Sequence, residues 1–357
     1  MAKKKDEGGS RLPSKTAPKE PIKSVQFDLF SQFLAKDPSE VSNTVEYWER
    51  IPKYFFSPEQ QNKLREPSGL AQSFTYEYKL RNNAGQELPY KVRIQPALIQ
   101  QPDGKDKAFF PTKTEENIEE VLKKIFTEQN HGIHDPKNIE SWVRFSYAMI
   151  RKELYRMRRG LRYDQIKHSL EVMSKCVLTV YEDGREIFTG AILQDYCSVD
   201  RNKYLEDSDA MHVARLPVFI SHAINTLQYR QYNYVRFMEC NEQLTRFLYK
   251  RLINRFINAN YTNDYHFMFS YIKQASGLLQ QARDNDNRRK VLEALEELKR
   301  RRVIYEYSKE DRREGRKVVD TKYTLKPHVD FVAEQKAANK RAQNHLEAQK
   351  DILLLGK

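Results

Sequence analysis

The chain contains a long internal repeat, and no other feature of the sequence limits its possible folds so strongly. The phrase Phe-Ser-Tyr occurs at residues 145–147 and again at 269–271. Each copy is followed by a helix-forming stretch, a basic stretch, a second helical pattern and a strand-like run, at 177–181 and 303–307 respectively. A repeat of this length indicates two structural units of one type.

The second helix of each unit has apolar residues at helical spacing. They are Ile166, Leu170, Met173 and Val177 in the first copy, and Val291, Leu295, Leu298 and Val303 in the second. Steps of three and four residues place such side chains on one face of a helix. Each unit then has the order strand, helix, turn, helix, β-hairpin, with arginine on the second helix. This order predicts an α+β chain with two tandem winged-helix domains.

Several local signals mark where these elements begin and turn. Thr112–Glu115 is a capping box, in which the Thr and Glu side chains bond free amides at a helix start. We expect Ser146 and Ser270 to cap the helices that follow the repeated phrase, and Asn241 to cap a long helix. Asp183–Gly184 predicts a tight hairpin turn, because both residues accept positive φ angles.

Composition along the chain predicts four parts. Residues up to about 24 have too few apolar side chains to offset the entropy lost on folding, which is typical of disorder. Strand-like runs over 74–80 and 90–99 are expected to add a lead-in or an extra sheet to the first unit. The parts are a disordered arm over 1–45, a first winged-helix domain over 46–205, a second over 206–330 and a loosely helical tail over 331–357.

The charge of the chain favours a polyanionic partner. Its 62 Lys and Arg exceed its 49 Asp and Glu, for a net charge of +13, which suits double-stranded DNA. No window approaches 18 consecutive apolar residues, so no membrane span is expected. Cys176, Cys197 and Cys240 form no Cys-x-x-Cys pair, so neither a disulfide framework nor a zinc site is expected. The N-terminus is not a secretory signal, and a cytoplasmic protein is expected.

The turn and second helix of the first unit are strongly basic. Between residues 151 and 167 there are seven basic residues and two acidic ones. Arg162, Gln165 and His168 lie near the helix start, where helix-turn-helix proteins place residues that reach base edges. Arg156, Arg158 and Arg159 lie in the turn and are expected to bind phosphates, as is Arg185 in the wing. The other cations of the expected DNA-binding set are Arg151, Lys152 and Lys167. A solvated charged face is the alternative.

The second unit has a similar set at the start of its second helix. The members are Arg283, Asn285, Asn287, Arg288, Arg289 and Lys290. The two asparagines and the pair Arg288–Arg289 are expected to contact bases, and the charged turn 309–317 to contact phosphate as the wing. The alternative is that Glu293, Glu296 and Glu297 pair with the basic side chains one turn away.

A short apolar peptide stands inside the otherwise polar N-terminal segment. It consists of Gln26, Phe27, Asp28, Leu29 and Phe30. It resembles the bacterial sliding-clamp-binding pentapeptide, Gln-Leu-Ser/Asp-Leu-Phe, and differs from it only at Phe27. In such a peptide two apolar side chains fill a pocket while the Gln amide bonds the rim. The alternative is that the segment docks its Phe on its own domain.

An arm with this peptide, followed by two winged helices, resembles the TrfA-type plasmid replication initiators. The resemblance is clearest at Trp142–Tyr147, at Gly160–Asp164 and at Leu292–Val303. It implies a bacterial, cytoplasmic, non-enzymatic protein that binds repeated origin sequences (iterons) and helps to open an adjacent AT-rich region. It also implies recruitment of the sliding clamp and of the host helicase and initiator, a monomer–dimer equilibrium, and a role in plasmid copy control.

Two other functions stay open, a transcriptional repressor and a rolling-circle nickase. A repressor would use the same two domains but would not need the clamp-type peptide. A nickase needs two His flanking one apolar residue, whereas His131 and His134 have two residues between them, in a loop expected at the surface. No Gly-x-x-x-x-Gly-Lys-Ser/Thr loop is present, so neither ATP hydrolysis nor a cofactor is expected. A row of Tyr229, Tyr232 and Tyr234 could stack bases, but core packing is expected.

Overall fold

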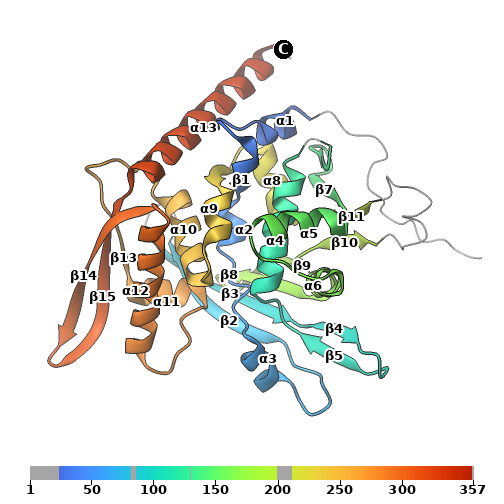
Figure 1. Ribbon diagram of the computed structural model, residues 1–357, viewed down its shortest axis with the longest axis horizontal. Helices are drawn as coiled ribbons and strands as arrows, with labels where there is room; N and C mark the ends of the chain where they lie inside the picture. The colour runs from blue at the N-terminus through green and yellow to red at the C-terminus, as the bar shows by residue number, and fades with distance from the viewer. Residues whose placement is uncertain (1–23, 82–85, 129, 199–210, 356–357) are drawn as a thin grey trace, which may run out of the picture.

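The computed structural model of the protein describes residues 24–81, 86–128, 130–198 and 211–355 (Figure 1). The expectations for residues 1–23 lie outside these ranges. The described residues form a mixed α+β structure, as expected. In Figure 1 the second predicted unit lies on the left and the first on the right, while the C-terminal helix projects from the top.

The first unit has the predicted order of elements. They are α4 (Lys113–Phe126), β6 (Gly132–Asp135), β7 (Glu140–Phe145), α5 (Tyr147–Arg156), α6 (Tyr163–Lys175), β8 (Val177–Glu182) and β9 (Arg185–Ala191). Its strands divide between two sheets, because β7 pairs with β6 and with β11 (His212–Arg215), whereas β8 pairs with β9 and with β3 (Glu87–Gln95). The extra N-terminal strands therefore extend the wing sheet.

The second unit is a winged helix in both element order and strand pairing. Its elements are α10 (Gln243–Arg255), β13 (Tyr265–Met268), α11 (Phe269–Ser276), α12 (Asp284–Arg300), β14 (Ile304–Glu314) and β15 (Lys317–Pro327). The sheet order is β13-β15-β14, so the strand before α11 pairs with the return strand of the wing. The two units thus share their element order but not their sheet pairing.

The remaining elements surround and join the two units. They are α1 (Val25–Ser31), the 3-10 helix η1 (Pro38–Glu40), β1 (Val41–Thr44), α2 (Glu46–Glu49), α3 (Pro58–Leu64), β2 (Phe74–Arg81), β4 (Ala97–Gln100), β5 (Asp106–Phe109), β10 (Gln194–Cys197), α8 (Val218–Asn225), β12 (Arg230–Asn233), α9 (Tyr234–Glu239) and α13 (Val329–Leu355). Strand β11 pairs with β7, and β12 pairs with β1. The sheets therefore do not divide at the predicted boundary near residue 206.

Both ends of the described chain are more ordered than the sequence suggested. The segment from residue 24 to 45 contains α1 and β1, so the predicted disordered arm does not reach residue 45. The predicted tail is helical, but α13 is one continuous helix that buries Phe331, Val332 and Ala338. In each case apolar side chains find a surface on the body of the protein, which offsets the entropy of ordering the segment.

The capping predictions were partly correct. The Glu115 carboxylate accepts the Thr112 N–H at 2.7 Å, and Ser146 caps α5. The Asp183–Gly184 turn has the expected positive φ angles of 46° and 78°. The predicted caps Ser270 and Asn241 were wrong. The Ser270 hydroxyl donates to Asp320, and the free amide before α10 donates to a carboxylate from α12 instead.

One contiguous apolar core runs through both units. Its buried members extend from Phe27 to Val332. Tyr229, Tyr232 and Tyr234 are all buried in it, which confirms that this row packs inside rather than stacking bases. His134 is also buried, so the prediction of a surface loop there was wrong. Within the described ranges, no helix combines the length and apolar character needed to cross a membrane.

Candidate nucleic-acid interface

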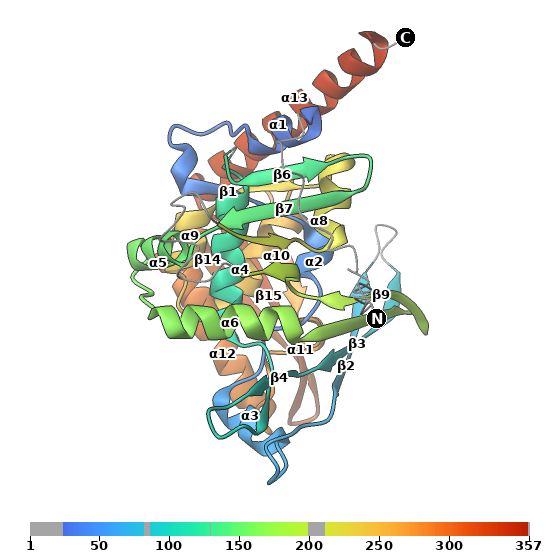
Figure 2. The ribbon, with the colours of Figure 1, turned by 90° about the vertical axis from the view of Figure 1, so that its right-hand side faces the viewer.

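The turn between α5 and α6 presents several free cations. Arg158 stands in this turn with φ of 55°, and its side chain is exposed. Lys152 and Lys167 are also exposed, and none of the three makes a side-chain hydrogen bond or ion pair within the described part of the chain. Figure 2 shows α6 lying across one face of the molecule, with α5 at its N-terminal end. This face can therefore accept an anionic backbone.

At the start of α6 the predicted base-reading side chains take part in local contacts. Arg162 is the N-cap residue, and its guanidinium lies 2.9 Å from the Asp164 carboxylate. The Gln165 side chain accepts the Arg162 N–H at 2.9 Å. The guanidinium of Arg151 lies 4.9 Å from the ring centroid of Tyr163, which is itself exposed. These contacts are all at the surface, so the groups can exchange them for DNA.

Three predicted phosphate or base contacts of the first unit have internal partners instead. Arg159 donates to the backbone carbonyls of Met238 at 2.8 Å and Cys240 at 2.5 Å, so it joins the turn to α9. His168 packs edge-on against Phe109, with the ring centroids 4.6 Å apart. Arg156 is held by Glu153 of its own helix at 2.6 Å. Arg159 is a structural residue here, because it donates two hydrogen bonds that join the turn to the end of α9, and the Cys240 carbonyl accepts a further one from Arg246 at 3.3 Å.

The second helix of the second unit, α12, also has some polar side chains that bind other parts of the protein and others that are exposed. Asn287 is fully buried, and its side-chain amide bonds both the N–H and the carbonyl of Gln281 at 3.0 and 2.9 Å. Arg288 lies over the Phe269 ring at 4.7 Å and donates to the Thr321 hydroxyl at 3.1 Å. The expectation that Asn287 and Arg288 read bases does not fit these positions. Asn287 instead binds α12 to the loop before it, and Arg288 binds α12 to the wing.

The exposed groups at the start of α12 are Arg283, Asn285 and Arg289. Arg283 precedes the helix and has no side-chain partner among the described residues. Arg289 is 69 % exposed and lies 3.2 Å from Asp286, one turn back. Lys290 is half-buried beside them. The cations here are opposed by neighbouring acids, so the surface offers hydrogen-bonding groups more than net positive charge.

The wing of the second unit is a long hairpin that projects from the body (Figure 1). Residues 308–317 are exposed along its outer part. It has five basic and three acidic side chains, namely Lys309, Arg312, Arg313, Arg316, Lys317, Glu310, Asp311 and Glu314. The wing of the first unit is shorter, with Arg185 exposed beside its turn. Cationic hairpins of this kind can reach phosphates beside the groove that a recognition helix enters.

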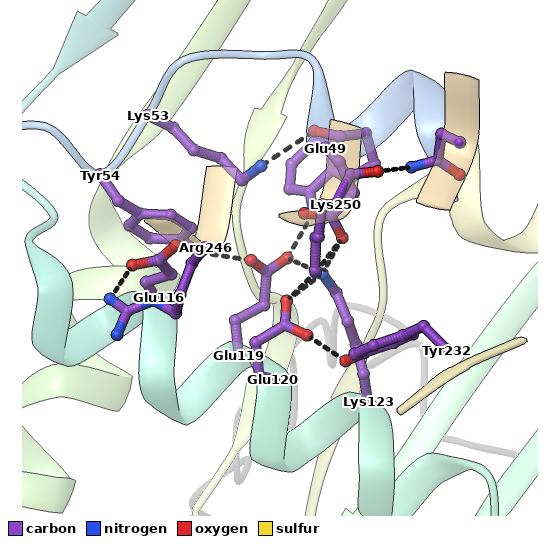
Figure 3. A network of polar contacts seen from close by, with 12 residues as sticks. Glu49, Lys53, Tyr54, Glu116, Glu119, Glu120, Lys123, Tyr232, Arg246 and Lys250 are labelled. Carbon is purple, nitrogen blue, oxygen red and sulfur yellow. Dashed lines mark hydrogen bonds and ion pairs between the residues drawn. The ribbon is translucent and has the colours of Figure 1, made fainter. Parts of the chain in front are cut away.

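A buried network of charged residues joins the first helices of the two units, and sequence reasoning missed it (Figure 3). Lys123 and Glu120 lie on α4, and Lys250 lies on α10. The Lys250 ammonium is 2.6 Å from Glu120 and 2.9 Å from Glu49 of α2, and the Lys123 ammonium is 3.0 and 2.7 Å from the same two carboxylates. Burial alone would raise the pKa of Glu120, but the two ammonium groups outweigh it and lower that pKa. The carboxylates are therefore ionised and paired.

Neutral donors complete this network. The Trp48 indole N–H and the Tyr54 hydroxyl both donate to Glu119, the latter at 2.9 Å, and the Tyr232 hydroxyl donates to Glu120 at 2.7 Å. The sequence held one signal for it. Five charged residues alternate with the apolar stripe of α4, namely Glu116, Glu119, Glu120, Lys123 and Lys124. Such a density of charge normally marks a helix in contact with solvent, so the pattern alone does not show that these side chains are buried.

The clamp-type peptide lies in α1 rather than in an extended arm. Phe27 and Phe30 are 5 % and 3 % exposed, packed against Phe126. Asp28 is exposed, while Gln26 and Leu29 are half-buried. In this structure the peptide docks on its own domain.

The described residues hold no cluster of three or more His, Cys, Asp or Glu suited to a metal ion. Both ring nitrogens of His134 are used in hydrogen bonds, to Ser141 at 3.0 Å and to Asn225 at 2.7 Å. Burial lowers the pKa of His134, which keeps the ring neutral. The unprotonated ring nitrogen of His134 therefore already accepts a hydrogen bond within the protein and is not available to bind a metal ion.

The sequence matches no known family model, and no curated protein matches it. The solved structures to which the chain is similar include the following two. The Pi initiator protein, crystallised in complex with iteron DNA, has 13 % identity and a TM-score of 0.42, covering 61 % of this chain and 91 % of that chain. Domains 2 and 3 of RctB have 13 % identity and a TM-score of 0.42, covering 75 % and 98 %. The winged-helix assignment of the second unit rests on the element order and strand pairing given above, and that of the first unit on its element order.

Proposed function

We propose that the protein is a plasmid replication initiator that binds repeated origin sequences through its two helix-turn-helix units. The observation that carries this proposal is that each unit exposes cations at the start of its second helix and beside its wing. Two such surfaces on one basic chain suit a site that contains two half-sites on duplex DNA. The resemblance of the sequence to TrfA-type initiators supports the same assignment.

Different residues serve two kinds of contact in this proposal. Arg283, Asn285 and Arg289 read base edges, because their side chains are exposed at the N-terminal end of α12. Arg158 and Lys167 bind phosphate and set the register of the first unit. Arg162 and Gln165 contribute base contacts from α6 once their surface contacts are exchanged.

The protein acts in this proposal by binding, without catalysis or a cofactor. It helps to open the adjacent AT-rich region and recruits host proteins, among them the sliding clamp through residues 26–30. A bacterial cytoplasmic location, a monomer–dimer equilibrium and a role in copy control belong to the same proposal.

Footprinting on the DNA that flanks the gene tests the proposal directly. We expect protection of repeated sites, with two protected segments per protein. Replacing Asn285 and Arg289 by Ala should relax discrimination between matched and mismatched repeats, by about 1–3 kcal/mol per lost base contact. Replacing Arg158 by Ala should instead weaken binding to all duplexes alike, and Lys340→Ala on the exposed side of α13 should change neither.

Three results would overturn this proposal. The first is the absence of any protected duplex, and the second is unchanged binding by all of the variants. The third is a covalent 5′ adduct on a tyrosine after incubation with supercoiled origin DNA and divalent metal, which would establish a nickase.

A further inference from the structure

Helix α1 buries both phenylalanines of the clamp-type peptide in a slot on the body of the protein. The Phe30 ring centroid lies 4.9 Å from that of Tyr229, in an edge-on contact, and 5.6 Å from that of Phe126. The Phe27 ring lies 5.1 Å from Phe126 and passes close to Gly132, where an added Cβ would stand 2.3 Å from the ring. The slot is therefore shaped around these two rings.

The C-terminal helix fastens α1 in this slot through one buried arginine. Arg341 of α13 is 2 % exposed, and its guanidinium donates to the carbonyl oxygens of Leu29, Phe30 and Gln32 at 3.2, 2.7 and 2.6 Å. It also donates to the Asn43 side chain at 2.6 Å, and that amide donates in turn to the Phe30 carbonyl at 2.7 Å. The last carbonyls of a helix lack partners within the helix, and a cation there is favourable. Arg341 therefore caps α1 from the other end of the chain.

We propose that α13 latches α1 in a state that cannot bind the sliding clamp. The peptide becomes available when the hydrogen bonds from Arg341 to the carbonyl oxygens of Leu29, Phe30 and Gln32 break. This inference rests on the proposed clamp binding. A pocket on another protein cannot receive the Phe30 ring while Phe126 and Tyr229 enclose it, so the two states exclude each other. Apparent affinity falls in proportion to the fraction of molecules in the competent state.

The latch can open without undocking the whole of α13. The first turns of this helix have their own anchors, because Arg236 pairs with Glu334 at 2.6 Å and Arg230 donates to Asn339 at 2.8 Å. Arg341 lies beyond both anchors. Movement of α13 from Arg341 onward, which also separates His345 from Tyr229, would therefore release α1 while the start of the helix stays attached to β12 and α9.

The test compares affinities for a purified bacterial sliding clamp. The ligands are a synthetic peptide of residues 22–34, the full-length protein, and full-length Arg341→Ala and Lys340→Ala variants. Lys340 is the exposed neighbour on the same helix, so it controls for loss of charge. We expect the peptide to bind, the wild type to bind at least about tenfold more weakly, and Arg341→Ala to regain most of that loss, since hydrogen bonds from a charged group are among the stronger ones. Lys340→Ala should match the wild type.

The possible results separate the latch from clamp binding itself. If the peptide does not bind the clamp, the clamp-binding proposal fails and the latch fails with it. If the peptide binds and the wild type binds equally tightly, or Arg341→Ala binds no better than the wild type, the latch alone is wrong. Should Arg341→Ala fail to fold, amide hydrogen exchange of the wild type decides. Saturating clamp should remove protection from residues 28–32, and unchanged protection there overturns the latch.

Discussion

The buried network between α4 and α10 predicts a large effect when one of its cations is removed. Lys250 is 6 % exposed, and its ammonium lies within 2.9 Å of carboxylates on both α2 and α4. Lys250→Met keeps the length and the apolar stem of the side chain but leaves Glu49 and Glu120 buried with Lys123 between them. Removing one partner of a buried ion pair costs about 3–5 kcal/mol, and here Lys123 would be left to pair with both carboxylates, so the network would keep an uncompensated buried charge.

Equilibrium urea unfolding measures this effect. Tryptophan fluorescence follows unfolding through Trp48, which donates to Glu119 inside the network, and through the buried Trp142, while circular dichroism follows the helices. We expect Lys250→Met to lower the free energy of unfolding by about 3–5 kcal/mol. Adding Glu120→Gln in the same chain should recover part of the loss, because it removes the excess negative charge.

An exposed ion pair is the matched control. Lys63 and Glu59 on α3 lie 2.7 Å apart with side chains 73 % and 78 % exposed. Lys63→Met should therefore change the free energy of unfolding by no more than about 1 kcal/mol. A loss of under about 1 kcal/mol for Lys250→Met, or strict additivity of the two network substitutions, would refute the reasoning that these charges act as a unit.

Three more outcomes concern single side chains. Asn287→Ala should lower the free energy of unfolding by about 1–3 kcal/mol in urea titrations, because it leaves two backbone groups of the preceding loop unpaired. Arg158→Ala should reduce the slope of log K for DNA against log salt by about one, whereas Arg159→Ala should destabilise the fold and leave that slope unchanged. Burial lowers the pKa of His345 to about 4, so the unfolded chain takes up the proton first as the pH falls. The free energy of unfolding should therefore decrease between about pH 6.5 and pH 4, and urea titrations should show a smaller decrease for His345→Gln.

Local sequence patterns predicted the elements of the two units well. The repeated phrase, the apolar spacing of α6 and α12 and the Asp183–Gly184 turn all report contacts between residues close in the chain. Such contacts are governed by helix period and by backbone φ preference, which a sequence displays directly. The strand order of the first unit was not predictable in this way, because pairing of β8 with β3 depends on a partner more than 80 residues away.

Charge was the less reliable signal at the candidate site. Arg159, Asn287 and Arg288 belong to polar sets that the sequence presents as one surface, yet each bonds backbone or side-chain groups inside the fold. Burial of a polar side chain depends on whether distant atoms complete its hydrogen bonds, and composition does not contain that information. The same holds for the clamp-type peptide, whose apolar residues suit an internal slot as well as an external pocket.

The buried network between α4 and α10 affects how the two units would bind DNA together. A flexible linker would let each unit find its half-site independently, and the allowed spacing between half-sites would be broad. Here α4 and α10 are joined by paired charges that are costly to separate, and one apolar core continues across both units. Helices α6 and α12 then have one fixed relation to each other, set by residues that are buried between the units. Selectivity for repeat spacing would accordingly reside in the interior of the protein, and base selectivity at the exposed starts of α6 and α12.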